Sequence, residues 1–140
     1  MITMRLFKES DRAALIALWQ ACGLTRPWND PDQDISFCIA SPAASILVAE
    51  ENGAVIGSAM VGHDGHRGWI YYLAVSPTQQ KAGLGRKLMA AAEDWCRQRG
   101  VPKLMLMVRP ENAAVRAFYE TLGYGEEERV IFSRRLDGVD

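Results

Sequence analysis

The stretch that decides the fold is Gln80-Lys81-Ala82-Gly83-Leu84-Gly85-Arg86-Lys87. It lies between an apolar, strand-like run that ends at Val75 and the start of an amphipathic helix. Because Gly83 and Gly85 lack a Cβ, the backbone there can come close to a ligand. Several backbone N–H groups can then point at one anion from the positive end of the helix, with basic side chains nearby. The sequence predicts a phosphate-binding turn, although a tight turn followed by close helix packing also explains the two glycines.

Two common nucleotide-binding motifs do not fit this turn. A P-loop requires a lysine and then a hydroxyl residue directly after its last glycine, whereas Gly85 is followed by Arg86 and Lys87. A dinucleotide-binding fingerprint requires a third small residue three positions after the second glycine, where this chain has Leu88. Neither motif explains the turn.

Two motifs far apart in the chain support another interpretation. The first is Leu73-Ala74-Val75-Ser76-Pro77 followed by Gln80-x-x-Gly83-x-Gly85, and the second is Asn112-Ala113-Ala114-Val115-Arg116-Ala117-Phe118-Tyr119-Glu120-Thr121-Leu122-Gly123-Tyr124. The first resembles the acetyl-CoA loop, Q/R-x-x-G-x-G/A, of the GNAT superfamily of N-acetyltransferases. The second resembles the later motif of that family, N-x-x-A-x-x-F/L-Y-x-x-x-G-F/Y. Within the superfamily, the sequence is similar to small bacterial proteins of the YpeA type.

This resemblance implies a GNAT fold of the α/β (α+β) class. A mixed, mostly antiparallel central sheet is flanked by helices, and residues 1–140 form one acetyltransferase domain. In this family the central strand, here Trp69 to Val75, splays from the following strand, here Lys103 to Val108, and the pantetheine arm lies in the resulting cleft. Main-chain groups of the central strand pair with the pantetheine amides, and N–H groups of the turn hold the pyrophosphate. The residues implied to bind the cosubstrate acetyl-CoA are Leu73, Ala74, Val75, Gln80, Lys81, Ala82, Gly83, Leu84, Gly85, Arg86, Lys87, Asn112 and Tyr119.

Tyr119 matches the family tyrosine that lies near the sulfur atom of the cosubstrate. A phenol with a reference pKa of about 10 can donate a proton to a forming thiolate, so we assign Tyr119 as the general acid. The alternative is that Phe118 and Tyr119 are core aromatics of an amphipathic helix. Asn112 can cap this helix, contact the pantetheine, or do both.

The motifs do not identify the general base. Some family members carry a glutamate in the central strand, where this chain has Trp69, and others carry one where this chain has Met107. An amine of pKa about 10 must still lose a proton before it attacks a thioester. A water chain or another residue must serve, and Asp64 and His66 are the candidates because their hairpin precedes the central strand. Alternatively, Asp64 forms the turn and His66 is a surface residue.

The loop 26–30 is the candidate acceptor-binding segment, since the family places substrate contacts between its first two helices. Trp28 can stack on an acceptor, and Asp30 or Asp32 can attract an ammonium group. A capped helix start under a packed tryptophan explains the same residues without a ligand. The acceptor is expected to be a small-molecule amine or a protein amino group, contacted by Trp28, Asn29, Asp30, Asp64 and His66.

Composition limits the class of protein further. The chain has 140 residues, 49% of them hydrophobic, and a formal net charge of −1, which is typical of one globular domain and argues against nucleic acid as the main partner. Two histidines, His63 and His66, are too few for a convincing metal site, and Cys22, Cys38 and Cys96 form no C-x-x-C pair. No signal-like or membrane-spanning apolar run is recognised. We expect a cytoplasmic protein without membrane contacts, and the sequence leaves a homodimer open.

Periodicity, caps and turn residues predict the order of elements. Asn52-Gly53 predicts a tight hairpin, Ser10-Asp11 and Asp30-Pro31 predict helix starts, and Gly23 and Gly123 predict helix ends. Helices are expected from Asp11 to Cys22 and over 31–40, 83–100 and 113–122. Strands are expected over 2–6, 45–51, 54–61, 69–75, 103–108 and 129–136.

The sequence thus predicts an acetyl-CoA-dependent N-acetyltransferase that acts on a primary amine by direct attack of the amine on the thioester. The competing class is a non-catalytic acyl-CoA-binding or regulatory domain, because both family glutamates are missing. A protein-interaction domain is a third class, and it predicts no binding of CoA.

Overall fold

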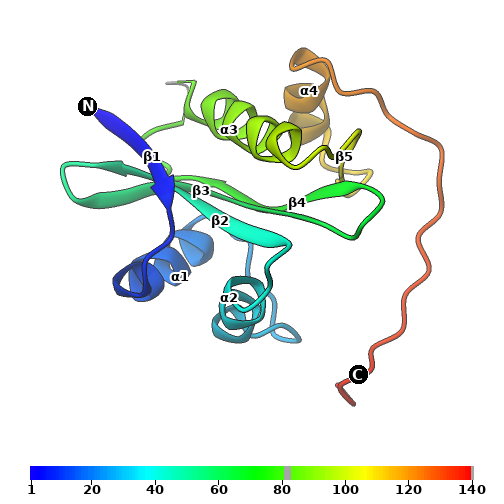
Figure 1. The fold of residues 1–140 in the computed structure, drawn as a ribbon, viewed down its shortest axis with the longest axis horizontal. Helices are drawn as coiled ribbons and strands as arrows, with labels where there is room; N and C mark the ends of the chain where they lie inside the picture. Colours follow the sequence, from blue (N-terminus) through cyan, green and yellow to red (C-terminus); the bar gives the residue numbers. More distant parts are fainter. Residues whose placement is uncertain (81–82, 140) are drawn as a thin grey trace. The chain divides into compact units, whose positions relative to one another are not determined.

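The structure is a computed structural model that describes residues 1–80 and 83–139. The chain divides into two compact units, Met1–Leu106 and Met107–Asp140. The first unit contains a sheet with helices on both of its faces (Figure 1). Its elements are β1 (Ile2–Leu6), the 3-10 helix η1 (Glu9–Asp11), α1 (Arg12–Ala21), α2 (Pro31–Ile39), β2 (Ala44–Glu51), β3 (Ala54–His63), β4 (Gly68–Val75), α3 (Leu84–Gln98) and β5 (Leu104–Leu106). The second unit contains α4 (Ala113–Thr121).

Within the described residues, the strands form one five-stranded sheet in the order β1-β2-β3-β4-β5. Neighbouring strands are antiparallel except β4 and β5, which are parallel. The β2–β3 hairpin turns at Asn52 and Gly53, whose φ angles of +51° and +80° are the left-handed values that a two-residue hairpin turn requires. The predicted mixed, mostly antiparallel sheet is confirmed.

The sheet of the first unit buries two separate apolar layers. Figure 1 shows α1 and α2 on one face of the sheet and α3 on the other. Trp19 and Ile35 pack with Ala74 on the α1–α2 face, whereas Leu84 and Leu88 pack on the α3 face. Side chains alternate along a strand, so β4 supplies residues to both layers. Residues of β4 therefore lie in both layers of the core.

Both helix starts predicted on the α1–α2 face are confirmed, but only one of the two helices is capped by the predicted side chain. Asp30 caps α2, since its carboxylate accepts the Asp32 backbone N–H at 2.9 Å and Pro31 takes the first helical position. The predicted capping of α1 by the Asp11 side chain is wrong. That carboxylate instead accepts the Lys8 backbone N–H at 2.8 Å and pairs with the Arg5 guanidinium at 2.7 Å, a stronger, charge-assisted bond.

In the second unit, α4 forms as predicted. The Asn112 side chain accepts the Val115 backbone N–H at 3.3 Å and so caps the helix. The chain leaves the helix through Gly123, whose φ of +93° is readily adopted only by glycine.

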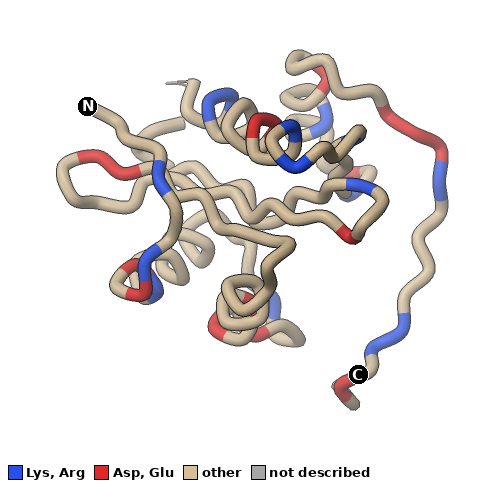
Figure 2. The backbone as a smooth tube through the Cα atoms, viewed as in Figure 1, with Lys and Arg blue, Asp and Glu red and all other residues tan. Residues whose placement is uncertain are grey.

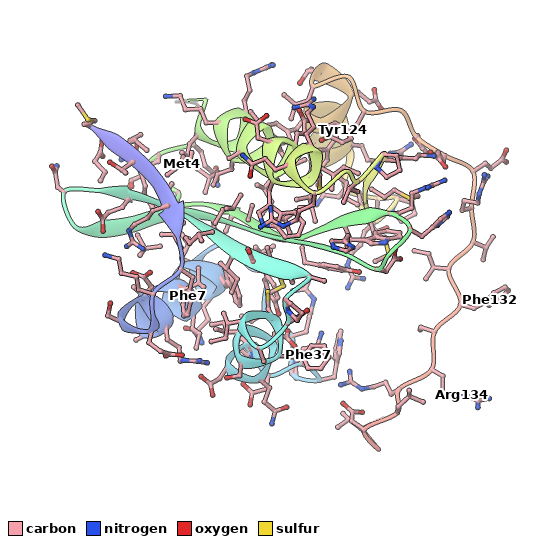
Figure 3. All side chains as sticks on the ribbon, viewed as in Figure 1. Met4, Phe7, Phe37, Tyr124, Phe132 and Arg134 are labelled. Carbon is pink, nitrogen blue, oxygen red and sulfur yellow. The ribbon has the colours of Figure 1, made fainter. Side chains whose placement is uncertain are left out.

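The predicted strand over 129–136 is wrong. Residues 129–136 have no regular secondary structure, and large apolar side chains there are exposed, with Phe132 at 93% and Leu136 at 92%. Figure 3 shows Phe132 and Arg134 on this extended segment. The β-branched and aromatic residues favour an extended backbone, but a strand also needs a partner for its hydrogen bonds, and no strand of the described chain pairs with this segment.

Charge is spread along the whole chain. Lysine and arginine are interspersed with aspartate and glutamate in both units, in keeping with the net charge of −1 (Figure 2). Cys22, Cys38 and Cys96 are free thiols. Among the described residues, every helix is too short or too polar to cross a bilayer.

Candidate active site

A bulge interrupts β4 in the middle of the sheet. The β3–β4 register shifts between Ser58 and Met60, so that one residue of β3 faces two residues of β4, Tyr72 and Leu73. Tyr72 has a φ of +51°, a left-handed conformation that costs about 1–2 kcal/mol for a residue with a Cβ. Strained residues of this kind persist only where their surroundings hold them, and they cluster at functional sites.

Side chains from three other elements hold the Tyr72 bulge. The Trp19 ring of α1 stacks on the Tyr72 ring with 3.7 Å between centroids and 8° between planes. The indole N–H of Trp19 donates to the buried Ser58 hydroxyl at 2.9 Å, and that hydroxyl donates to the Tyr72 carbonyl at 2.9 Å. The Tyr72 hydroxyl donates to the Asp34 carboxylate of α2 at 2.5 Å. Contacts from β3, α1 and α2 therefore fix both the backbone and the ring of Tyr72.

Only the first part of β4 is paired on the side of β5. Gly68, Trp69 and Ile70 face the three residues of β5 in parallel register. Among the described residues, the stretch 71–75 has no strand partner on that side. Unpaired main-chain N–H and C=O groups at a strand edge can pair with an extended ligand. The strand predicted over 103–108 is shorter than expected, because β5 spans only Leu104–Leu106. The unpaired edge of β4 includes Leu73, Ala74 and Val75.

The start of α3 is fixed in place and open to an anion. Gly83 occupies the N-cap position with a φ of +76°, and a Cβ built there meets no atom within 4 Å. The first turn carries no acidic side chain, so its backbone N–H groups face no competing carboxylate. Leu84 anchors the helix: a Cβ added at Gly57 would lie only 3.1 Å from the Leu84 side chain. This geometry fits a phosphate group at the helix start, with exposed Arg86 and Lys87 beside it.

The segment that leads into α3 folds back on the end of β4. The Gln80 side-chain amide donates to the Val75 carbonyl at 3.3 Å, and the Cys22 thiol donates to the same oxygen at 3.2 Å. Lys81 and Ala82, which the sequence assigned to the turn, lie outside the described residues. The assignment of this turn to acetyl-CoA stays a prediction at the level of single residues.

In the second unit, Tyr119 is the buried aromatic of α4. It is 9% exposed, and the rings of Phe118 and Tyr124 contact it edge to face at 5.0 and 5.9 Å. Burial raises the pKa of Tyr119 to about 12, so the phenol keeps its proton at neutral pH. These contacts fit a core aromatic as well as an acid, and the role of Tyr119 in proton transfer stays a prediction.

Several of the residues predicted to contact the acceptor hold local structure in place or are exposed. Asp64 accepts backbone N–H groups from His66 at 2.9 Å and Arg67 at 2.7 Å, which lowers its pKa to about 2. Such an acidic carboxylate is a poor base, and these bonds support its role as a turn former. His66 is exposed, and Trp28 is 47% exposed in the loop before α2. The Asn29 backbone N–H donates to the Arg26 carbonyl at 3.1 Å.

Sequence reasoning did not identify Asp34 and Tyr72. Tyr72 lies within an apolar strand pattern, where a tyrosine is readily taken as a core residue, and the bulge that turns it leaves no local motif. Asp34 lies in the first turn of α2, where an acidic residue is explained by the helix dipole alone. Their pairing joins positions that lie 38 residues apart in the chain.

Known proteins resemble this chain in sequence and in fold. The profile of the Acetyltransferase (GNAT) family matches residues 8–124. An acetyltransferase of Yersinia enterocolitica is 43% identical over 133 residues, which cover 95% of this chain and 94% of that protein. An acetyltransferase of Pectobacterium atrosepticum is also 43% identical over 133 residues, with the same coverage. The solved structure of the aminoglycoside N-acetyltransferase AAC(6')-Iy in complex with CoA has a TM-score of 0.84 at 20% identity, covering 97% of this chain and 95% of that chain.

The chain therefore belongs to the GNAT family and has the α/β fold of that family. Because its family and its relatives at 43% identity are acetyltransferases, the chain is an N-acetyltransferase. The narrower resemblance to the YpeA type stays a prediction.

Proposed function

We propose that this protein transfers the acetyl group of acetyl-CoA to a primary amine, by direct attack of the amine on the thioester. The observation that carries the proposal is the junction of β4 and α3. A strand with an unpaired edge is followed, after residues 76–83, by a helix start that is open to an anion. An acyl-CoA has an extended amide-containing arm and a pyrophosphate, which need these two features in this order. That AAC(6')-Iy was solved with CoA supports an acyl-CoA as the cosubstrate.

The main chain of this junction supplies most of the proposed contacts. Backbone groups of Leu73 to Val75 pair with the pantetheine amides, and one N–H there points at the thioester oxygen. Backbone N–H groups from the turn and the first residues of α3 hold the pyrophosphate, with Arg86 and Lys87 adding positive charge. Asn112 caps α4 and contacts the pantetheine, and Tyr119 gives a proton to the departing thiolate. Bound acetyl-CoA itself supplies the activated acetyl group.

We further propose that both units belong to one catalytic domain in the cytoplasm. The family match runs from residue 8 to 124, across the boundary between the units at Leu106. Three free cysteines are consistent with a reducing compartment. The acceptor is a small-molecule amine or a protein amino group. Solved proteins of this fold include aminoglycoside and glucosamine-6-phosphate N-acetyltransferases, which supports an amine acceptor without identifying it.

Two measurements test the proposed function. Calorimetric titration with acetyl-CoA, free CoA and a longer acyl-CoA is expected to show binding and a preference for acetyl-CoA. A thiol-release assay is then run with aminoglycosides, glucosamine 6-phosphate, polyamines and peptides that carry a free α-amino group or a lysine. We expect CoA release with at least one of these amines. Binding of acetyl-CoA without any turnover would contradict the proposed function and favour the non-catalytic acyl-CoA-binding class.

A further inference from the structure

We propose that Asp34 is the carboxylate that binds the ammonium group of the acceptor and that Tyr72 positions it. This inference rests on the proposed function and deepens it, because it assigns the acceptor subsite to residues that no sequence motif identifies. Asp34 lies in the first turn of α2 and Tyr72 in the bulge of β4, and their hydrogen bond connects the helix to the strand.

The charge of Asp34 favours a positively charged ligand. The carboxylates of Asp11 and Glu50 pair with Arg5, and those of Glu9 and Asp32 pair with Arg12. Among the described residues Asp34 has no such cation; the partner of its carboxylate is the neutral hydroxyl of Tyr72. A half-buried carboxylate without a cation is suited to a positively charged ligand.

The other two carboxylates predicted to contact the acceptor are already engaged with backbone donors. Asp30 accepts the Asp32 backbone N–H as the cap of α2. Asp64 accepts two backbone N–H groups and the Trp69 indole N–H within its own hairpin. Asp34 accepts a single hydroxyl, which leaves lone pairs of its two oxygens available for the donors of an ammonium group. It is therefore the best of these three carboxylates for binding an amine.

Tyr72 lies next to the strand residues that are proposed to bind the cosubstrate. Tyr72 directly precedes Leu73, so its Cα lies about 3.8 Å from that of the first residue proposed to pair with the pantetheine. The Tyr72 ring stacks on Trp19 of α1 and its hydroxyl reaches α2, whereas Leu73 packs with Leu84 of the α3 layer. The acceptor ammonium would thus be bound on the α1–α2 face, while the phosphates are bound at the start of α3. β4 lies between the two and presents the thioester to the amine.

The backbone strain at Tyr72 also supports its positioning role. The left-handed backbone at Tyr72 is strained, and the Ser58 and Trp19 contacts hold it in that conformation. An ordinary strand residue would not need this conformation to pack against α1. The bulge turns the Tyr72 hydroxyl to Asp34, where it fixes one carboxylate oxygen. A fixed carboxylate binds a cation with less loss of side-chain freedom.

Asp34→Asn tests the inference, with Glu9→Gln as its matched control. Both variants replace one carboxylate by the amide of the same size, but the Glu9 side chain is 66% exposed and paired with Arg12. With the amine from the panel that gives the highest turnover, Asp34→Asn should raise the acceptor KM by about ten- to a hundred-fold, the range for loss of one charged hydrogen bond. The Kd for acetyl-CoA should stay within about two-fold of wild type. Glu9→Gln should leave both constants near wild type.

Tyr72→Phe tests the positioning role of the hydroxyl. It keeps the ring that stacks on Trp19 and removes only the bond to Asp34, so the acceptor KM should rise about three- to ten-fold while kcat changes little. A merely structural role would instead lower the melting temperature and leave the acceptor KM unchanged.

The outcomes separate this inference from the proposed function. If the wild-type protein releases CoA with an amine but Asp34→Asn keeps the wild-type acceptor KM, the inference is overturned and the function stands. Equal loss of acetyl-CoA affinity and acceptor affinity in Asp34→Asn also overturns it. If no amine gives turnover in the wild type, the proposed function fails first and this inference fails with it. Should Asp34→Asn not fold, Asp34→Glu decides: a raised acceptor KM at unchanged acetyl-CoA Kd supports the inference, and an unchanged acceptor KM overturns it.

Discussion

The turn between β4 and α3 and the segment from α1 to α2 differ in which part of the chain does the binding. At the turn, the proposed contacts come from backbone groups, and the side chains there need only be absent, as at Gly83, or pack inward, as Leu84 does. In the α1–α2 segment the proposed contacts come from individual side chains, such as Trp28 and Asp34. A site built from backbone groups depends little on which side chains are present. A side-chain site can change with each acceptor.

The largest expected effect is at the backbone site. Gly85→Glu places a bulky anion at the second residue of α3, beside the proposed pyrophosphate, and should abolish measurable binding of acetyl-CoA. Calorimetric titration checks this. Gly125→Glu is the matched control, because a Cβ at Gly125 meets no atom within 4 Å and that residue lies outside both motifs. If folded Gly85→Glu binds acetyl-CoA with wild-type affinity, the turn does not bind the pyrophosphate. The difference between a backbone site at the turn and a side-chain site at α1–α2 would then also fail.

The next effect concerns chemistry rather than binding. Tyr119→Phe removes only the hydroxyl, so it should lower kcat by about ten- to a thousand-fold and leave the acetyl-CoA Kd nearly unchanged. Because the pKa of Tyr119 is raised to about 12, its proton is lost only as the pH rises toward that value. In the wild type we therefore expect no fall in kcat from this group between about pH 7 and pH 10. A Phe variant with the wild-type kcat would show that Tyr119 only packs.

A third prediction tests how firmly the α1–α2 face holds the β4 bulge. Ser58→Ala leaves the buried Trp19 indole N–H and the Tyr72 carbonyl without their partner, and it should lower the free energy of unfolding by about 1–3 kcal/mol. Denaturant titration measures it. Ser45→Ala is the control, since Trp95 donates to Ser45 at 3.1 Å in a partly exposed place where water can replace the hydroxyl. Equal losses in the two variants would mean that the Ser58 network has no special role in stability.

The smallest effect is expected in the loop before α2. Trp28→Ala and Asp30→Asn should raise the acceptor KM or lower kcat/KM several-fold, by about three- to ten-fold, without changing the acetyl-CoA Kd. Asparagine caps a helix about as well as aspartate, so Asp30→Asn removes charge but keeps α2. Phe37→Ala, at a side chain that is 85% exposed on α2, controls for loss of an exposed aromatic. If the steady-state kinetics of both loop variants match wild type, the loop has only a structural role. Of the proposed acceptor contacts on this side of the sheet, only Asp34 would then remain.

Several elements were predictable from the sequence because their signals are local. Asn52-Gly53 requires the positive φ angles that the structure shows, and Asp30-Pro31 has the cap and the first helical residue in adjacent positions. The segment 129–136 was predicted wrongly because a strand depends on a partner that is not local in the sequence. Its residues prefer an extended backbone, but a strand exists only when another strand pairs with it, and local preference cannot supply that partner.

By itself, the sequence determined the family, the order of helices and strands as far as α4, and the junction at Gly83, because glycines, caps and strand patterns act within a few residues of each other. Only the tertiary structure decided which carboxylates have a cation as partner. It gave Asp11 to Arg5, Asp32 to Arg12 and Asp64 to its own turn, and it brought Tyr72 to Asp34 across 38 residues. Partners of a charged side chain are set by distance in space, and that distance exists only once the helices have packed on the sheet.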